Sequence, residues 1–128
     1  MTVCGIDHYN IRASSELLEE LKAFYCDVIG LNVGDRPPFD EFGYWLYAGG
    51  HAVLHLSLAS DGEVLATDIQ TTLNHVALAC TGRAEVEQRL QEFGVSYRTA
   101  HVPATNVVQL FIKDPAGSGI ELSFEDES

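Results

Sequence analysis

The chain has 128 residues, of which 46% are apolar, and its 19 acidic and 7 basic residues give a formal net charge of −12 at pH 7. A chain of this length and apolar content can bury a substantial core as one domain, which excludes intrinsic disorder. The negative charge repels phosphate backbones and anionic lipids, so we expect neither a nucleic acid nor a membrane as partner.

The first half of the chain predicts a strand, a helix and three further strands. Residues 3–13 are typical of a strand, and Ser14 or Ser15 is a suitable cap for the helix that follows. Apolar residues recur at helical spacing as far as Val28, and Gly30 is expected to end the helix in the left-handed conformation. The next predicted strands are residues 31–34, 43–48 and 52–59, with a Gly49-Gly50 turn between the last two.

Residues 60–72 are polar and predict an irregular linker, after which the same order of elements returns. The predicted elements are a strand at 73–81, a helix at 83–93 and strands at 96–102, 106–113 and 119–124. A turn at 114–117 joins the last two strands, and residues 125–128 are expected to fray. The sequence therefore predicts one domain, residues 1–128, built from a module at about 3–59 and a second at about 73–124.

Three cysteines, Cys4, Cys26 and Cys80, stand at no metal-binding spacing. An odd number without a secretory leader argues against a disulfide framework and indicates a reducing compartment, so we expect a cytoplasmic protein. We interpret each cysteine as a small buried apolar residue rather than a nucleophile.

Four residues of metal-binding type stand at equivalent positions of the two halves. Aligning the opening strands superimposes His8 on His75, and aligning the closing strands superimposes His55 on Glu121. The separations are nearly equal, 47 positions (55 − 8) and 46 positions (121 − 75). This repeat predicts two copies of one unit folded around a single ion.

Strand alternation supports that interpretation, because it places all four side chains on the face opposite the bulky apolar rows. A carboxylate in the middle of a strand, as at Glu121, is costly unless it is paired or bound to a cation. The alternative is that the histidines are hydrogen-bonded structural residues and that Glu121 lies on a strand edge open to water. We interpret the two other histidines, His51 and His101, as surface residues.

Three imidazoles and a carboxylate suit Zn²⁺, Ni²⁺, Co²⁺, Mn²⁺ or Fe²⁺. With His55 withdrawn, the remaining three residues would form the triad used by non-haem Fe(II) oxygenases. The sequence contains no nucleophile elbow, phosphate-binding loop or dinucleotide fingerprint.

Four segments carry a family resemblance. They are Asp7-His8-Tyr9-Asn10-Ile11, Ala23-Phe24-Tyr25-Cys26-Asp27-Val28-Ile29-Gly30-Leu31, Asn74-His75-Val76-Ala77 and Lys113-Asp114-Pro115-Ala116-Gly117-Ser118-Gly119-Ile120-Glu121-Leu122. On these segments, over about residues 5–124, the chain resembles the vicinal oxygen chelate superfamily, which includes glyoxalase I, extradiol dioxygenases and bleomycin-resistance proteins. The resemblance implies an α+β fold of two βαβββ modules, whose curled, mostly antiparallel sheet forms a cup with the helices on its outer face. It also implies a homodimer.

The same resemblance implies that His8, His75 and Glu121 are metal ligands on the first, fifth and last strands. His55 occupies the fourth-strand position, where glyoxalase I normally carries a glutamate that also moves protons. Histidine is a different base and lowers the negative charge around the ion. His55 either completes the ligand set or acts as a proton shuttle, and His55 and Glu121 are the predicted catalytic residues.

Three functions follow as hypotheses. The leading one is a divalent-metal-dependent lyase or isomerase, in which the metal polarises a carbonyl or enediolate of a small-molecule substrate. The alternatives are an Fe(II) extradiol-type dioxygenase and a metal-free binder of cationic drugs, which the charge of −12 would attract. Trp45, Tyr47 and Gln109 are candidate pocket residues, with the core as the alternative position for the two aromatic rings.

Overall fold

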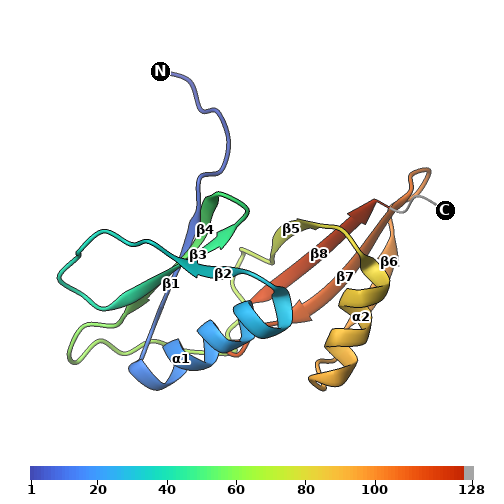
Figure 1. The fold of residues 1–128 in the computed structure, drawn as a ribbon. Helices are drawn as coiled ribbons and strands as arrows, with labels where there is room; N and C mark the ends of the chain where they lie inside the picture. Colours follow the sequence, from blue (N-terminus) through green and yellow to red (C-terminus); the bar gives the residue numbers. More distant parts are fainter. Residues whose placement is uncertain (126–128) are drawn as a thin grey trace. The chain divides into compact units, whose positions relative to one another are not determined.

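The structure is a computed structural model and describes residues 1–125. The chain forms two compact units, which meet in sequence between Ala66 and Thr67, inside the predicted linker (Figure 1). Each unit contains one strand, a helix and three further strands, in the order that the repeat predicts. Over the described residues, no helix has both the length and the apolar character needed to span a membrane.

The first unit is a four-stranded sheet with a helix between its first two strands. Its elements are β1 (Tyr9–Ala13), α1 (Ser15–Ala23), the π-helical segment η1 (Phe24–Ile29), β2 (Asn32–Gly34), β3 (Gly43–Ala48) and β4 (His51–Leu58). The strands lie in the order β1-β4-β3-β2. β1 runs parallel to β4, and the other two pairings are antiparallel.

The ends of the first helical stretch follow the predicted signals. The Ser14 hydroxyl accepts a hydrogen bond from the Leu17 N–H at 3.3 Å, which caps α1. Leu18 and Leu21 are fully buried, and α1 packs against β1 and β4. Gly30 adopts φ 101° and ends η1 in the left-handed conformation, which glycine accepts without strain.

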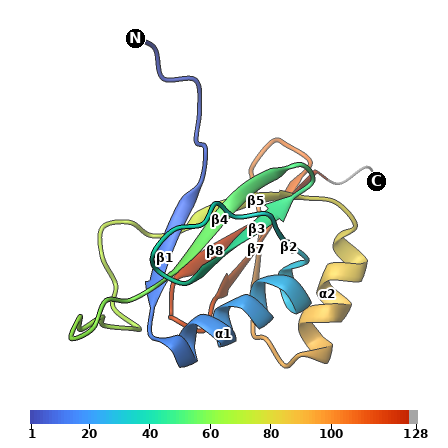
Figure 2. The same cartoon turned by 60° about the vertical axis from the view of Figure 1, so that its left-hand side comes forward.

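The second unit repeats this architecture, as the two views in Figures 1 and 2 show. Its elements are β5 (Val76–Cys80), α2 (Arg83–Glu92), β6 (Arg98–His101), β7 (Val107–Lys113) and β8 (Gly119–Glu125). The order is β5-β8-β7-β6, with β5 parallel to β8 and the other pairings antiparallel. Both sheets are therefore mixed but mostly antiparallel, as predicted.

The two parallel strand pairs have equivalent registers. Asn10 of β1 lies opposite His55 of β4, and Ala77 of β5 lies opposite Glu121 of β8. In each unit, therefore, the residue two positions after the aligned histidine pairs across the parallel strands with the other candidate ligand, His55 or Glu121. β4 and β8 are central strands, so Glu121 does not lie on a sheet edge, and the edge alternative fails.

Alternation along the central strands agrees with the predicted core. Leu54 and Leu56 of β4 have no exposed surface, and Ile120 and Leu122 of β8 are each 1% exposed. The predicted turn before β8 is also present, because the Asp114 carboxylate accepts hydrogen bonds from two following backbone N–H groups.

Several predicted strand ends were wrong. β1 begins at Tyr9 rather than residue 3, and β5 begins at Val76 rather than residue 73, so both aligned histidines stand one residue before a strand. The ladder starts only where the parallel partner supplies hydrogen bonds, which local sequence does not reveal. Glu125 belongs to β8 rather than to a frayed tail, and the rest of that predicted tail lies outside the described residues.

The cysteines differ in part from the prediction. All three thiols are free, and Cys4 is exposed rather than buried. Cys26 and Cys80 are half-buried, and burial raises the pKa of both thiols. A raised pKa disfavours the thiolate, which agrees with their interpretation as non-nucleophilic residues.

Candidate functional site

The first unit holds a stack of three aromatic rings on the sheet face opposite its buried leucines. Trp45 of β3 lies directly across from His55 of β4, and the two rings stack with centroids 4.1 Å apart. The His8 ring stacks on the other side of His55, with centroids 3.7 Å apart and planes 15° from parallel. His55 is therefore held between two flat rings, which fixes its orientation.

The stack also determines the charge of His55. Burial lowers the pKa of His55, and the neighbouring His8 acts in the same direction, while a hydrogen bond to the Ala52 backbone opposes both. A histidine with a lowered pKa is neutral at pH 7 and keeps a lone pair. That is the form needed for a metal ligand or a general base.

His8 is oriented by the residue before it. Its Nδ1 lies 2.7 Å from the Asp7 carboxylate, and this hydrogen bond lowers the pKa of Asp7. Asp7 also contacts His51, whose Nε2 lies 2.5 Å from the Asp7 carbonyl oxygen. Contacts at Nδ1 leave Nε2 as the free nitrogen of His8.

The second unit pairs the other two candidates. His75 Nε2 lies 3.1 Å from Glu121 Oε1, and the Glu121 side chain is only 8% exposed. His75 Nδ1 lies 2.7 Å from the Asn74 side-chain oxygen, and the Phe111 ring meets the imidazole edge-on, with centroids 5.5 Å apart. A buried carboxylate thus contacts an imidazole nitrogen directly.

The repeat therefore extends to the groups that orient the histidines. In both units the side chain preceding the histidine holds Nδ1 at 2.7 Å, through Asp7 in one and Asn74 in the other. Such contacts commonly set the tautomer of a metal-binding histidine and leave Nε2 to the ion. The sequence prediction missed this role, although a short polar acceptor before each aligned histidine was a usable signal.

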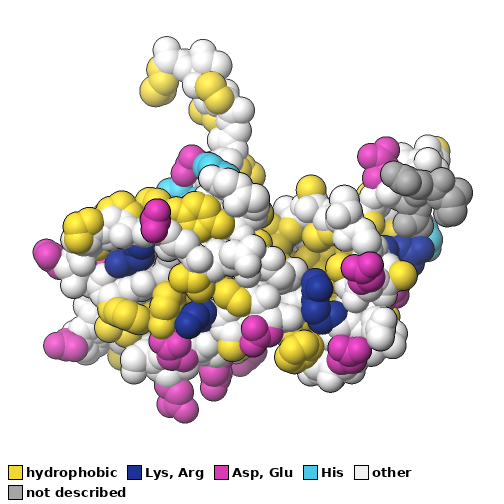
Figure 3. All heavy atoms as spheres, in the orientation of Figure 1, with side chains coloured by type: hydrophobic (Ala, Val, Ile, Leu, Met, Phe, Trp, Pro, Cys, Tyr) yellow, Lys and Arg dark blue, Asp and Glu magenta, His cyan; other side chains and the backbone are white. Residues whose placement is uncertain are grey.

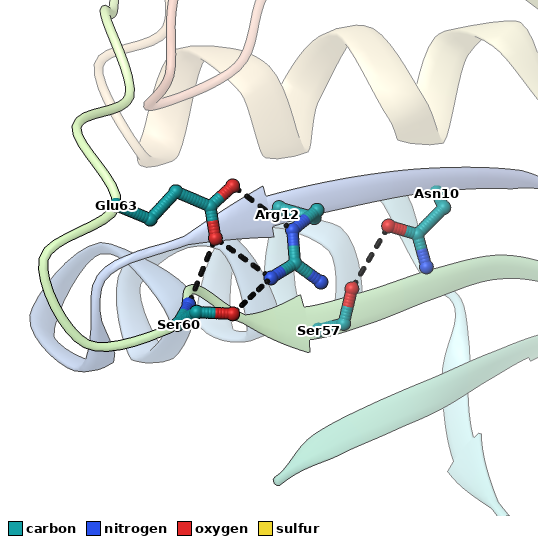
Figure 4. Close-up of polar contacts among 5 residues, drawn as sticks. All are labelled: Asn10, Arg12, Ser57, Ser60 and Glu63. Carbon is teal, nitrogen blue, oxygen red and sulfur yellow. Dashed lines mark hydrogen bonds and ion pairs between the residues drawn. The ribbon is translucent and has the colours of Figure 1, made fainter. Parts of the chain in front are cut away.

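A polar cluster links β1, β4 and the start of the linker (Figure 4). Its strand residues Asn10, Arg12 and Ser57 alternate onto the same sheet face as His55. Ser57 Oγ donates to Asn10 Oδ1 at 2.9 Å. Arg12 donates to both carboxylate oxygens of Glu63, at 2.7 and 3.2 Å, and Glu63 also accepts from the Ser60 N–H. These contacts, Arg12 foremost, lower the pKa of Glu63 to about 2. They fasten the start of the linker to β1, a link that the sequence did not reveal.

The sequence pattern of the Glyoxalase/Bleomycin resistance protein/Dioxygenase superfamily matches residues 5–122. The chain belongs to this superfamily. A relative that is 34% identical over 124 residues is Glyoxylase I 4 of Arabidopsis thaliana, and the alignment covers 92% of this chain and 69% of the relative.

Solved structures of the glyoxalase superfamily share the fold. A glyoxylase/bleomycin resistance protein/dioxygenase domain from Frankia sp. EAN1pec matches with a TM-score of 0.75 at 15% identity, over 98% of this chain and 100% of that one. An antibiotic binding protein from Streptomyces sp. CB03234 matches with a TM-score of 0.70 at 20% identity, over 98% and 99% of the two chains. These likenesses confirm the predicted α+β glyoxalase-like fold class.

Glyoxalase-superfamily members typically use divalent metal ions, and the donor chemistry of this chain fits such an ion. Among residues 1–125, neither unit gathers three or more His, Cys, Asp or Glu side chains as a ligand set, but each presents a candidate pair. Donors bound at neighbouring positions, each about 2.1 Å from an ion, lie roughly 3.0–3.4 Å apart. The 3.1 Å between His75 and Glu121 satisfies this requirement.

The three predicted pocket residues, Trp45, Tyr47 and Gln109, have different surroundings. Trp45 belongs to the ring stack. The Tyr47 hydroxyl donates a hydrogen bond to the Asp35 carbonyl oxygen at 2.7 Å. Gln109 of β7 lies across from Ser123 of β8 and two residues before Phe111. The two other histidines, His51 and His101, are exposed, as predicted.

Proposed function

We propose that this chain is a divalent-metal-dependent lyase or isomerase of glyoxalase type, in which His8, His75 and Glu121 hold one ion and His55 either acts as the proton shuttle or completes the ligand set. The observation that carries the proposal is Glu121. Its carboxylate is buried on a central strand, and its only partner among the described residues is the Nε2 atom of His75. A buried carboxylate without a full counter-charge is what a cation site requires.

Family membership supports the class of reaction. The relative from Arabidopsis thaliana carries the name Glyoxylase I 4, and its sequence is 34% identical to this chain. A bound ion would supply Lewis-acid polarisation of a carbonyl or enediolate oxygen on a small-molecule substrate. His55, neutral because its pKa is lowered, would accept a proton from the adjacent carbon and return it. Glu121 is the second group proposed to act in catalysis.

Metal content tests the proposal directly. Protein purified without added metal is analysed by mass spectrometry, before and after incubation with Ni²⁺, Zn²⁺, Mn²⁺, Co²⁺ or Fe²⁺. We expect about one ion per chain, with a large loss in His75→Ala and none in His101→Ala, because His101 is exposed on β6. Less than about a tenth of an equivalent under every condition would refute metal dependence.

Activity is then assayed with the metal-loaded protein on methylglyoxal–thiol adducts, acyl-CoA epimers and catechols. Turnover of one of the first two, with proton exchange at the carbon beside the carbonyl, is the expected result. Oxygen uptake with catechols under ferrous conditions would instead support the Fe(II) dioxygenase, in which His8, His75 and Glu121 act without His55. We propose a homodimer on the resemblance alone, to be checked by sedimentation.

One observation favours a second candidate function. The chain shares its fold with an antibiotic binding protein, and its net charge of −12 would attract a cationic drug. Tight binding of bleomycin by metal-stripped protein, unchanged in His75→Ala, would support that candidate over the enzyme.

A further inference from the structure

Arg36 lies in the loop between β2 and β3, and its guanidinium rests against the start of β3. A Cβ atom at Gly43 would stand 2.9 Å from Arg36 Nη2 and 3.1 Å from Cζ, so only glycine allows this close approach. On another side, the Phe39 ring centroid is 4.9 Å from Cζ. The guanidinium is therefore held between backbone and an aromatic ring, with its side chain 15% exposed.

One donor of the guanidinium is buried without an acceptor. The N–H at Nε donates to no acceptor among the described residues. The nearest carboxylate, that of Glu41, stands 3.8 Å from Nη2, which is too long for a hydrogen bond, and its side chain is half exposed. A buried arginine donor without an acceptor is costly to maintain unless a ligand supplies the acceptor.

The Arg36 guanidinium belongs to the same sheet face as the ring stack. Gly43 precedes Trp45 by two residues on β3, so a Cβ at either position points to the same side of the sheet. The Trp45 ring centroid lies 6.2 Å from that of Phe39, on which Arg36 rests. The charge of Arg36 also contributes to lowering the pKa of His55.

We propose that Arg36 binds the carboxylate of a substrate whose apolar part lies against Phe39 and Trp45; this inference rests on the proposed function and names its substrate class. The planar guanidinium matches a carboxylate with two parallel hydrogen bonds.

The charge around Arg36 favours a monoanion. Asp35, Asp40 and Glu41 share its loop, the chain has 19 acidic against 7 basic residues, and Figure 3 shows acidic side chains over the surface of both units. A single arginine in this field balances one negative charge, whereas a phosphate dianion would meet net repulsion.

The test uses metal-free protein and the fluorescence of Trp45, which is the single tryptophan of the chain. Phenylacetate is titrated as the probe, with neutral phenylacetamide and inorganic phosphate as comparisons. We expect saturable binding of phenylacetate only, and a loss of about tenfold or more in Arg36→Met with partial retention in Arg36→Lys. Arg83→Met, which removes the same charge from the Glu87 ion pair on α2, is the matched control and should bind normally.

The proposal is overturned if Arg36→Met binds phenylacetate as tightly as the wild type does, or if the wild type binds phenylacetamide as tightly as phenylacetate. Arg36-dependent binding of phosphate that is tighter than that of phenylacetate overturns the carboxylate specificity. Glu41→Gln provides an independent variant if Arg36→Met fails to fold, because removing the competing carboxylate should tighten phenylacetate binding a few-fold. Unchanged or weaker binding there would also contradict the proposal. Since no metal is present, failure here leaves the metal measurement standing, and failure of the metal measurement leaves this titration interpretable.

Discussion

Glu121→Gln separates the cost of burying a carboxylate from its use as a ligand. Glutamine keeps the shape of the side chain and one hydrogen bond to His75, but it carries no charge. Because the Glu121 side chain is only 8% exposed, the metal-free protein should become more stable when the charge is removed. The metal-bound protein should instead become less stable on the same substitution, because it loses a metal ligand.

The magnitudes follow from burial and from binding linkage. Because His75 is half exposed and leaves the buried charge incompletely compensated, replacing that charge by a neutral group of equal size is expected to stabilise the metal-free chain by about 1–2 kcal/mol. Metal at a hundred times its dissociation constant stabilises the wild-type protein by about 2.7 kcal/mol, and only by about 0.4 kcal/mol if the variant binds about a hundredfold more weakly. For a chain of this length, each kcal/mol shifts Tm by roughly 3–5 °C.

The assay is thermal unfolding of wild type and Glu121→Gln, each without metal and with metal at about a hundred times the wild-type dissociation constant. We expect the variant to melt roughly 3–10 °C higher without metal, and to show a metal-induced shift smaller by roughly 7–11 °C. Glu125→Gln, which neutralises an exposed carboxylate on the same strand, should change neither value by more than about 2 °C. A Glu121→Gln protein that is less stable without metal and equally stabilised by it would refute the reasoning.

Three further predictions concern the neighbouring groups. Asn74→Ala should weaken metal binding about 10- to 100-fold without changing the stoichiometry, because Asn74 orients His75. Isothermal titration calorimetry measures this affinity, and an unchanged affinity would contradict the orienting role of Asn74. Because the pKa of His55 is lowered in the folded protein, the unfolded chain binds the proton more readily. The free energy of unfolding should therefore decrease as pH falls below about 6.5. Denaturant titrations of His55→Gln should show a weaker decrease. Glu63, with a pKa of about 2 when folded, should stabilise the protein above pH 4.5, and the Tm difference between wild type and Glu63→Gln should vanish as pH falls from 4.5 towards 2; a difference that persists at pH 2 would contradict the Arg12 ion pair.

The architecture followed from local signals along the chain. Helical spacing, the Ser14 cap and the Gly30 ending depend on residues within a few positions, so the first helix could be predicted closely. The duplication predicted the same order of elements in both halves, and the structure adds that the two parallel strand pairs have equivalent registers. Strand starts failed where a ladder depends on a distant partner, as at Tyr9 and Val76.

The sequence by itself also identified both candidate pairs, since the aligned histidines and Glu121 carry donor types whose chemistry is independent of context. Only the tertiary structure decided what surrounds them: the Trp45 ring stacked on His55, the burial of Glu121 and the buried, unpaired Nε atom of Arg36. The physical reason is distance along the chain. Rings from different strands meet only after the sheet has formed, and whether a charge lacks a partner depends on every side chain that folding brings around it.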